Sequence, residues 1–170
     1  MSKAFQLGVK YLSVRMRTEA EVRKYLEKKE CPLNEIDGAM KSLREYKYVD
    51  DSKYCQMYFR AAAGKGRGRQ RILNELYTKG IDRDTAENAI DDFLEEADED
   101  IMDYGDLILD ERQRALSIAE KMVRQHLSDG KEVDQKFTAK VGRRLAGQGY
   151  GADTVYWVLG KLRKNEDEWM

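Results

Sequence analysis

The chain has 170 residues, of which 41% are hydrophobic and 37% are charged, and it contains a single proline. This length fits one domain or a few small repeated units, and the composition favours a mostly helical protein. The sequence has no apolar run of 18 residues and no signal-peptide pattern, which excludes a membrane span, and its two isolated cysteines indicate reduced thiols in the cytosol.

The net charge of −1 hides an uneven distribution. Residues 1–81 contain 18 lysines and arginines against 10 acids, whereas residues 82–111 contain one base against 14 acids. Residues 112–164 are basic again, with 12 bases against 5 acids. Two basic regions therefore flank an acidic one, and this pattern matters more for the choice of partner than the average charge does.

The first helix of each of three predicted units is expected at residues 3–14, 51–63 and 112–128. In the second of these stretches, Asp50 or Asp51 is a suitable N-cap, and Tyr54, Met57 and Tyr58 are expected to share one face. The third stretch carries an apolar face as well, formed by Ala115, Ile118, Ala119, Met122 and Val123.

One apolar pattern then follows each of these helices. The three copies align on Leu26, Leu76 and Leu145. A β-branched residue precedes each leucine by four positions, and apolar residues follow it at the spacing of one face of an α-helix. The aligned positions are Val22, Ile72 and Val141; Ile36, Ala86 and Val155; Ala39, Ala89 and Val158; Met40, Ile90 and Leu159; and Leu43, Phe93 and Leu162.

The ends of the aligned helices also repeat. Asn34, Asp84 and Asp153 are expected as N-caps of the third helix in each unit. Gly80 and Gly149 are expected as left-handed residues that end the second helix, and in the first copy Pro32 is expected to stop it.

The sequence thus predicts an all-α protein of nine helices in three tandem three-helix units, which stack into an elongated curved body. The expected parts are unit 1 at 3–46, unit 2 at 50–97, an acidic connector or helix extension at 98–111, and unit 3 at 112–164.

No group of residues points to catalysis. His126 is the only histidine and is expected to be partly buried, and Cys55 is expected in the core rather than as a reactive thiol. The acidic stretch "DEDIMDYGDL" lacks the spacing of a calcium loop. We therefore expect no enzyme activity, no cofactor and no metal.

The stretch "GKGRGRQR" is not a nucleotide-binding loop, because Lys65 is followed by Gly66 where a Walker loop needs serine or threonine. It leaves a positively charged, glycine-rich start of a helix, with Arg67, Arg69 and Arg71 available to an anionic partner. The alternative is a solvated linker between two helices.

Four segments together resemble the RecX family of bacterial recombination regulators. They are "YLSVRMRTEAEVRKYL", "YKYVDDSKY", "GKGRGRQRILNELYTKGI" and "RRLAGQGYGADTV", in this order along the chain. Glu30 and Gln148 depart from the residues usual in the family, as does the dense acidic stretch before Asp110.

The resemblance implies tandem three-helix units and a cytoplasmic, non-enzymatic regulator that acts in homologous recombination and DNA repair, and we expect it to be an inhibitor. Such a protein would bind the RecA recombinase or its filament on DNA and modulate filament growth, ATP hydrolysis and strand exchange. A stand-alone DNA-binding module remains the alternative, and we expect a monomer.

Charge suggests two sets of partner-binding residues. The first is Lys65, Arg67, Arg69 and Arg71, and the second is Lys140, Arg143 and Arg144. The second set has an alternative interpretation as the solvated outer face of a helix whose inner face holds Val141 and Leu145.

Overall fold

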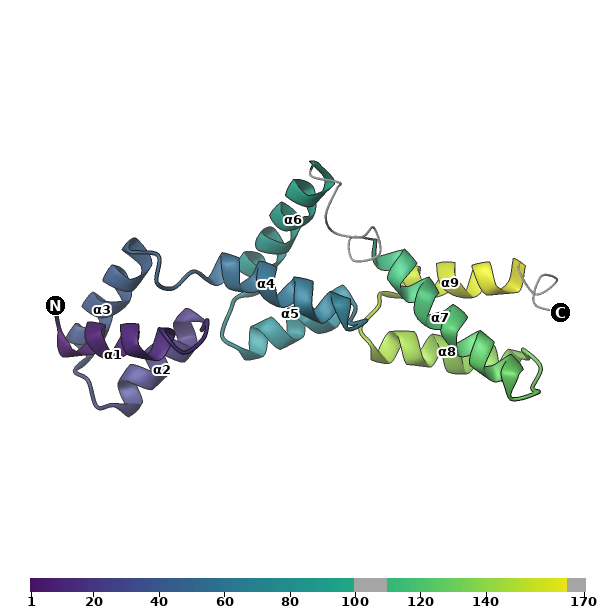
Figure 1. The fold of residues 1–170 in the computed structure, drawn as a ribbon, viewed down its shortest axis with the longest axis horizontal. Helices are drawn as coiled ribbons and strands as arrows, with labels where there is room; N and C mark the ends of the chain where they lie inside the picture. The colour runs from purple at the N-terminus through teal and green to yellow at the C-terminus, as the bar shows by residue number, and fades with distance from the viewer. Residues whose placement is uncertain (100–109, 165–170) are drawn as a thin grey trace. The chain divides into compact units, whose positions relative to one another are not determined.

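The computed structural model describes residues 1–99 and 110–164, with side chains up to residue 96 in the first range. Within these two ranges the chain forms nine α-helices and no strand (Figure 1). They are α1 (Lys3–Leu12), α2 (Glu19–Lys28), α3 (Leu33–Glu45), α4 (Asp51–Gly64), α5 (Arg69–Thr78), α6 (Arg83–Glu99), α7 (Glu111–Ser128), α8 (Gln135–Gly147) and α9 (Ala152–Lys164).

The expected all-α fold of three-helix repeats is confirmed. The boundaries expected for the three units and the acidic connector stay predictions, and residues 100–109 of that connector lie outside the described part. No described helix is both long and apolar enough to cross a membrane.

The contacts divide the chain into two compact units, each made of two segments. The N-terminal unit comprises Met1–Tyr58 and Leu73–Phe93, and the C-terminal unit comprises Phe59–Ile72 and Leu94–Met170. The division therefore falls inside α4, inside α5 and inside α6, so the second sequence repeat is shared between the two units.

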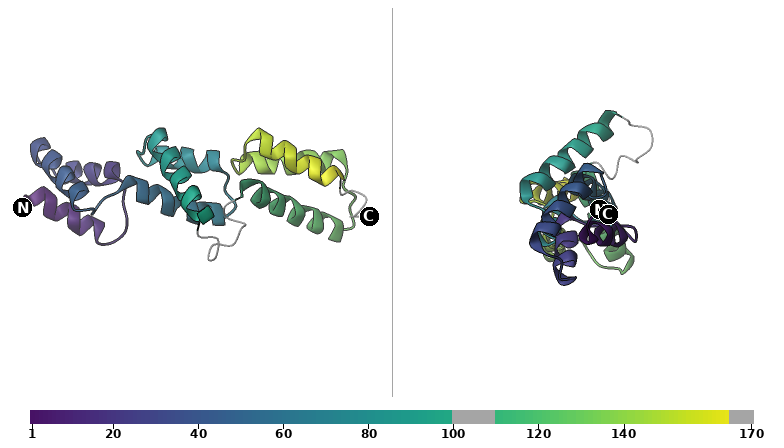
Figure 2. Two further views of the ribbon diagram at one scale, coloured as in Figure 1. Left: turned by 90° about the horizontal axis from the view of Figure 1, so that it is seen from above. Right: turned by 90° about the vertical axis from the view of Figure 1, so that its left-hand side faces the viewer.

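The N-terminal unit has its main core between α1, α2 and α3. Leu26, Ile36 and Leu43 are completely buried there, and Gly8 lets α1 approach the Leu43 side chain closely. In the C-terminal unit, α7, α8 and α9 lie side by side in both views (Figures 1 and 2) and enclose Val123 and Leu145.

The second helix of every repeat ends in the same way. The carbonyl groups of Leu26, Leu76 and Leu145 accept hydrogen bonds from the backbone N–H groups five residues later, each at 3.2 Å. The residue before each donor has a positive φ: 57° at Glu30, 85° at Gly80 and 91° at Gly149. This is a Schellman ending, and it confirms the predicted roles of both glycines. In the first copy Glu30, not Pro32, ends the helix.

In the N-terminal unit the end of α5 is fixed against the start of α2. The Thr18 hydroxyl caps α2 by accepting a hydrogen bond from the Glu21 N–H at 3.1 Å. The same hydroxyl donates to the Lys79 carbonyl at 2.8 Å. A β-carbon at Gly80 would overlap the Ala20 side chain, so glycine is required here by space as well as by φ.

The corresponding contact in the C-terminal unit joins the start of α5 to the end of α8. The Gly68 N–H donates to the Gln148 carbonyl at 2.8 Å, and the Gln70 N–H donates to the Gly149 carbonyl at 3.3 Å. A β-carbon at Gly68 would overlap the Gly149 carbonyl group, and one at Gly149 would overlap Arg71. The close contact between these backbone segments therefore explains why glycine is required at Gly68 and at Gly149.

The expected N-caps of the third helices are wrong. These helices begin at Leu33, Arg83 and Ala152, so Asn34, Asp84 and Asp153 lie inside the first turn. At α6 the cap is formed by Asp82, whose carboxylate accepts a hydrogen bond from the Thr85 N–H at 2.9 Å. Asp84 and Asp153, in the first turns of α6 and α9, still stabilise these helices, because their negative charges lie near the positive end of the helix dipole.

The expected face of α4 is wrong in one position. Tyr54, Cys55 and Phe59 are buried, whereas the Met57 side chain is 55% exposed. The buried face of α4 therefore includes Cys55 and Phe59 and leaves Met57 in solvent. Both cysteines are free thiols, as expected.

Leu76→Ala should lower the free energy of unfolding by roughly 2–5 kcal/mol, because it leaves a cavity at a fully buried position. Urea denaturation followed by circular dichroism measures this change. Tyr77→Ala is the matched control, since the neighbouring side chain is 70% exposed and its loss should change stability little. Equal effects of the two substitutions would contradict the assigned core.

Gly149→Ala should destabilise the protein by about 1–3 kcal/mol, because alanine is strained at a φ of 91° and would also collide with Arg71. Gly160→Ala is a control within α9, where a β-carbon meets no atom within 4 Å. This control should stabilise the helix by about 0.5–1 kcal/mol. Thermal unfolding measures both changes in stability, which should have opposite signs. An unchanged stability of Gly149→Ala would contradict the close contact with Arg71.

Candidate anion-binding hollow

A surface depression, here called the hollow, lies wholly within the C-terminal unit. It has a volume of about 700 Å3 and is bordered by the end of α4, by α7 and by the first turns and last turn of α8. The turn 64–66, which follows α4, forms one wall. This volume is in the range of sites that bind peptides and small molecules.

The walls of the hollow are strongly basic. Seven side chains that line it carry or can carry positive charge: Lys65, Arg114, Lys121, His126, Lys131, Lys140 and Arg144. Asp129 is the one carboxylate among the lining residues, and its Oδ2 lies 3.8 Å from Lys131 Nζ. Lys65, Lys121, Lys140 and Arg144 make no ion pair with any residue that the structure describes. The hollow therefore has a surplus of positive charge.

Arg114 contributes a buried cation to the wall. Its side chain is only 5% exposed, and its guanidinium carbon lies 5.9 Å from the centre of the Phe59 ring. The guanidinium also hydrogen-bonds the Tyr150 hydroxyl, which donates to the Gly66 carbonyl at 2.9 Å. Burial raises the pKa of Tyr150, although the positive charge of Arg114 acts in the opposite direction. These contacts connect α7, the turn 64–66 and the start of α9.

The floor of the hollow is apolar. It is formed by Ile118, Met122 and Phe137, of which the two aliphatic side chains are half-buried and Phe137 is buried. The His126 ring stacks on the Phe137 ring with centroids 3.8 Å apart, and its Nε2 lies 3.0 Å from the Glu132 carbonyl oxygen. The expected partly buried position of His126 is confirmed.

The hollow brings together residues from both predicted basic sets. Lys65 from the first set and Lys140 and Arg144 from the second all line it. Arg143 lines a smaller depression next to it, which it shares with Lys140 and His126. Lys65 lies far from Lys140 and Arg144 in the sequence. The backbone hydrogen bond from Gly68 to Gln148 brings the two parts of the chain close together.

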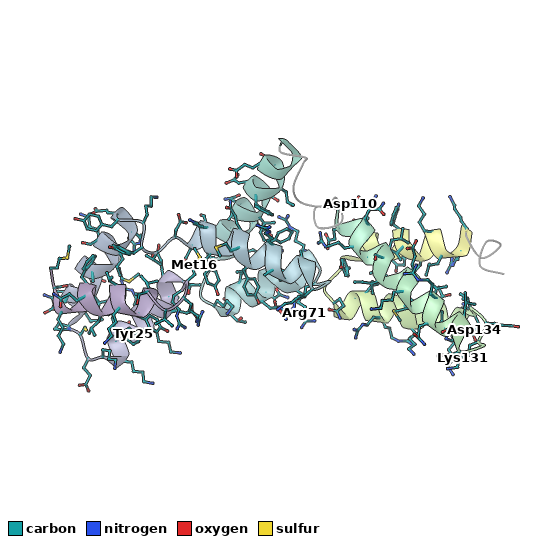
Figure 3. All side chains as sticks on the ribbon, viewed as in Figure 1. Met16, Tyr25, Arg71, Asp110, Lys131 and Asp134 are labelled. Carbon is teal, nitrogen blue, oxygen red and sulfur yellow. The ribbon has the colours of Figure 1, made fainter. Side chains whose placement is uncertain are left out.

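The other arginines of the first set lie outside the hollow. Arg71, near the start of α5 (Figure 3), places its Nη1 3.3 Å from Gln148 Oε1. The backbone N–H of Arg69 donates to a Glu111 carboxylate oxygen at 3.1 Å. Arg67 and Arg69 also make further contacts within the fold. The Arg71 side chain and the Arg69 backbone thus help to hold the start of α5 in the C-terminal unit.

Sequence reasoning missed the basic residues of α7. Arg114, Lys121 and the half-buried Ile118 follow one another at helical spacing along the wall of the hollow. That spacing was present in the sequence, but a helix with bases on one side is also typical of a solvated surface. Lys131, in the turn between α7 and α8 (Figure 3), carried no separate signal.

A second group of titratable residues lies in the N-terminal unit. The half-buried Asp51 carboxylate accepts a hydrogen bond from the Glu19 N–H at 2.9 Å. Burial raises the pKa of Asp51, and the neighbouring carboxylates of Glu19, Asp50 and Asp82 raise it further. Burial, together with the charges of Asp51 and Asp82, raises the pKa of the Cys55 thiol to about 12, so this thiol stays protonated and unreactive.

Asp51→Asn should increase stability at pH 7. Because the pKa of Asp51 is raised above its ordinary value of 3.8 by folding, the folded protein binds this proton more tightly than the unfolded chain. The contribution of Asp51 to the free energy of unfolding therefore falls as the pH rises above 3.8. Asparagine keeps the acceptor for the Glu19 N–H and removes the buried charge.

Urea denaturation between about pH 4 and pH 7 measures this effect, and the advantage of Asp51→Asn should shrink toward the acidic end. Asp92→Asn, at an exposed position of α6, is the control. A variant at Asp51 that is less stable than the wild type at pH 7 would show that the carboxylate charge is favourable there.

The fold is that of an all-helical repeat protein with a cationic surface hollow, and comparisons with known proteins give its family. The models for the first and second three-helix domains of RecX match residues 4–43 and 50–90. A relative from Bacillus velezensis named "Regulatory protein RecX" is 33% identical over 99% of this chain. One of that name from Mycolicibacterium smegmatis is 28% identical, and the match covers 98% of this chain and 82% of the relative.

The crystal structure of RecX from Lactobacillus salivarius has a TM-score of 0.77 at 22% identity, and the match covers 95% of each chain. It supports the fold. The chain belongs to the RecX family. It spans 59% of the Bacillus velezensis relative and 58% of a relative from Oceanobacillus iheyensis, to which it is 28% identical. These relatives are named as regulatory proteins, not as enzymes.

Proposed function

We propose that this protein is a non-enzymatic regulator of the RecA recombinase. It binds RecA or the filament that RecA forms on DNA, restrains filament growth, and lowers ATP hydrolysis and strand exchange. Membership of the RecX family is the observation that carries this proposal. In this proposal the protein acts in the cytoplasm, in homologous recombination and DNA repair.

The mechanism that we propose is occupancy. The protein lies against the filament and competes with the addition of a further RecA protomer or with the incoming duplex. A regulator of this kind needs no group that donates or accepts protons in a reaction. The cationic hollow supplies one surface for such a contact, since its exposed lysines remain available to negative charges.

A stand-alone DNA-binding module is the second candidate, and the same hollow favours it. Lysines and arginines without carboxylate partners attract a phosphate backbone, and binding of that kind weakens steeply with salt. The two candidates differ in whether RecA is needed.

The expected result is a decrease of the DNA-stimulated ATPase of RecA, and of filament assembly, when the protein is titrated to stoichiometric amounts. Unchanged ATPase and assembly would refute the proposal. Tight, salt-dependent binding to DNA in the absence of RecA would favour the second candidate.

Lys65→Glu combined with Lys140→Glu should weaken the inhibition of RecA by about tenfold, equivalent to roughly 1.4 kcal/mol of binding free energy, because both residues line the hollow. The melting temperature should change little, since both side chains are exposed. Lys24→Glu with Lys28→Glu, two exposed positions of α2, is the control with the same change in net charge. Equal loss of inhibition in both double variants would remove the hollow from the contact surface.

A further inference from the structure

We infer that the hollow of the C-terminal unit is a binding site for an acidic peptide segment that carries a large apolar side chain between its carboxylates. This inference goes beyond regulation of RecA and does not depend on it. It rests on the cations of the walls and on the apolar floor. It rests also on two missing features: an open face of Phe137 for a nucleobase, and free backbone N–H groups at Lys65 and Gly66 for a phosphate.

The charge of the hollow selects a negatively charged partner. Lys65, Lys121, Lys140 and Arg144 stand around the opening without a carboxylate partner among the described residues. Lys131, by contrast, lies close to Asp129. Lysines are flexible point charges, so they adapt to carboxylates at several positions along a peptide.

The floor selects an apolar side chain. Ile118 and Met122 are half-buried in a depression whose rim is charged, so part of their surface remains open to a ligand. A methionine fills gaps of irregular shape and adapts to different side chains. A leucine or phenylalanine of the peptide would cover this surface while the neighbouring carboxylates reach the rim.

The hollow does not suit a nucleobase or a compact phosphate. Phe137 is only 5% exposed, and one of its faces is covered by the His126 ring, so Phe137 offers no open face for a base to stack on. The backbone N–H groups of Lys65 and Gly66 donate to Ala62 and Ala63 within their own turn. They are therefore not available as the backbone cradle that typically holds a phosphate.

The test uses the whole chain and fluorescein-labelled peptides in a fluorescence anisotropy titration at low salt. The probe is the peptide GDEDLFDEDG, and GDEDSSDEDG is a peptide of equal charge without apolar side chains. A labelled oligothymidylate of similar length represents single-stranded DNA. No recombinase is present, so this result and that of the ATPase assay are independent.

We expect the wild type to bind the leucine–phenylalanine peptide at least about tenfold more tightly than the serine peptide. Lys121→Glu with Arg144→Glu should weaken binding at least about tenfold, because both residues line the hollow. Arg124→Glu with Arg163→Glu is the matched control with the same change in net charge. Arg124 is exposed on α7 and Arg163 is exposed in the last turn of α9, and neither lines the hollow. This pair should change the affinity less than about twofold.

Three results would overturn the inference. They are no binding of the leucine–phenylalanine peptide by the wild type, equal weakening by both double variants, and equal affinity for the two peptides. Tighter binding of the oligothymidylate, lost only in the Lys121–Arg144 variant, would assign the hollow to nucleic acid instead. Circular dichroism of each variant checks that the helices remain formed.

Discussion

The fold depends on how the second helix of each repeat ends. A hydrogen bond to the carbonyl of Leu26, Leu76 or Leu145 reverses the chain, and the same leucine side chain is completely buried. One residue thus sets both the end of the helix and its position in the core. Where glycine follows, the turn is small enough to lie directly against the start of another helix, as Gly80 lies against Ala20.

This backbone contact also creates the candidate site. The hydrogen bond from Gly68 to Gln148 fixes the turn 64–66 beside α7 and α8, and the Tyr150 hydroxyl binds the same turn at Gly66. Lys65 therefore joins the bases of α7 and α8 around one hollow. The concentration of charge is a product of tertiary contact, since no short segment of the sequence contains it.

The repeat could be predicted because apolar spacing follows from helix geometry, which is local. The buried positions at Leu26, Leu76 and Leu145 confirm it. The cap of α6 was misplaced because two aspartates near its start can act as a cap, and Asp82 stands two positions before Asp84. At α3 the cap position is taken by Pro32, which makes no side-chain hydrogen bond to the helix. The hollow could not be predicted, since its members come from α4, α7 and α8 and meet only in the tertiary structure, through contacts such as those of Gly66 and Gly68.

The division inside α4, α5 and α6 has a consequence for synthesis on the ribosome. When residue 93 has left the exit tunnel, every residue of the N-terminal unit is available for folding. The segment Phe59–Ile72 has emerged as well, but its partners Glu111, Arg114, Gln148 and Gly149 have not. The Phe59 ring, which is buried in the finished protein, therefore lacks its contact with Arg114 until α7 emerges.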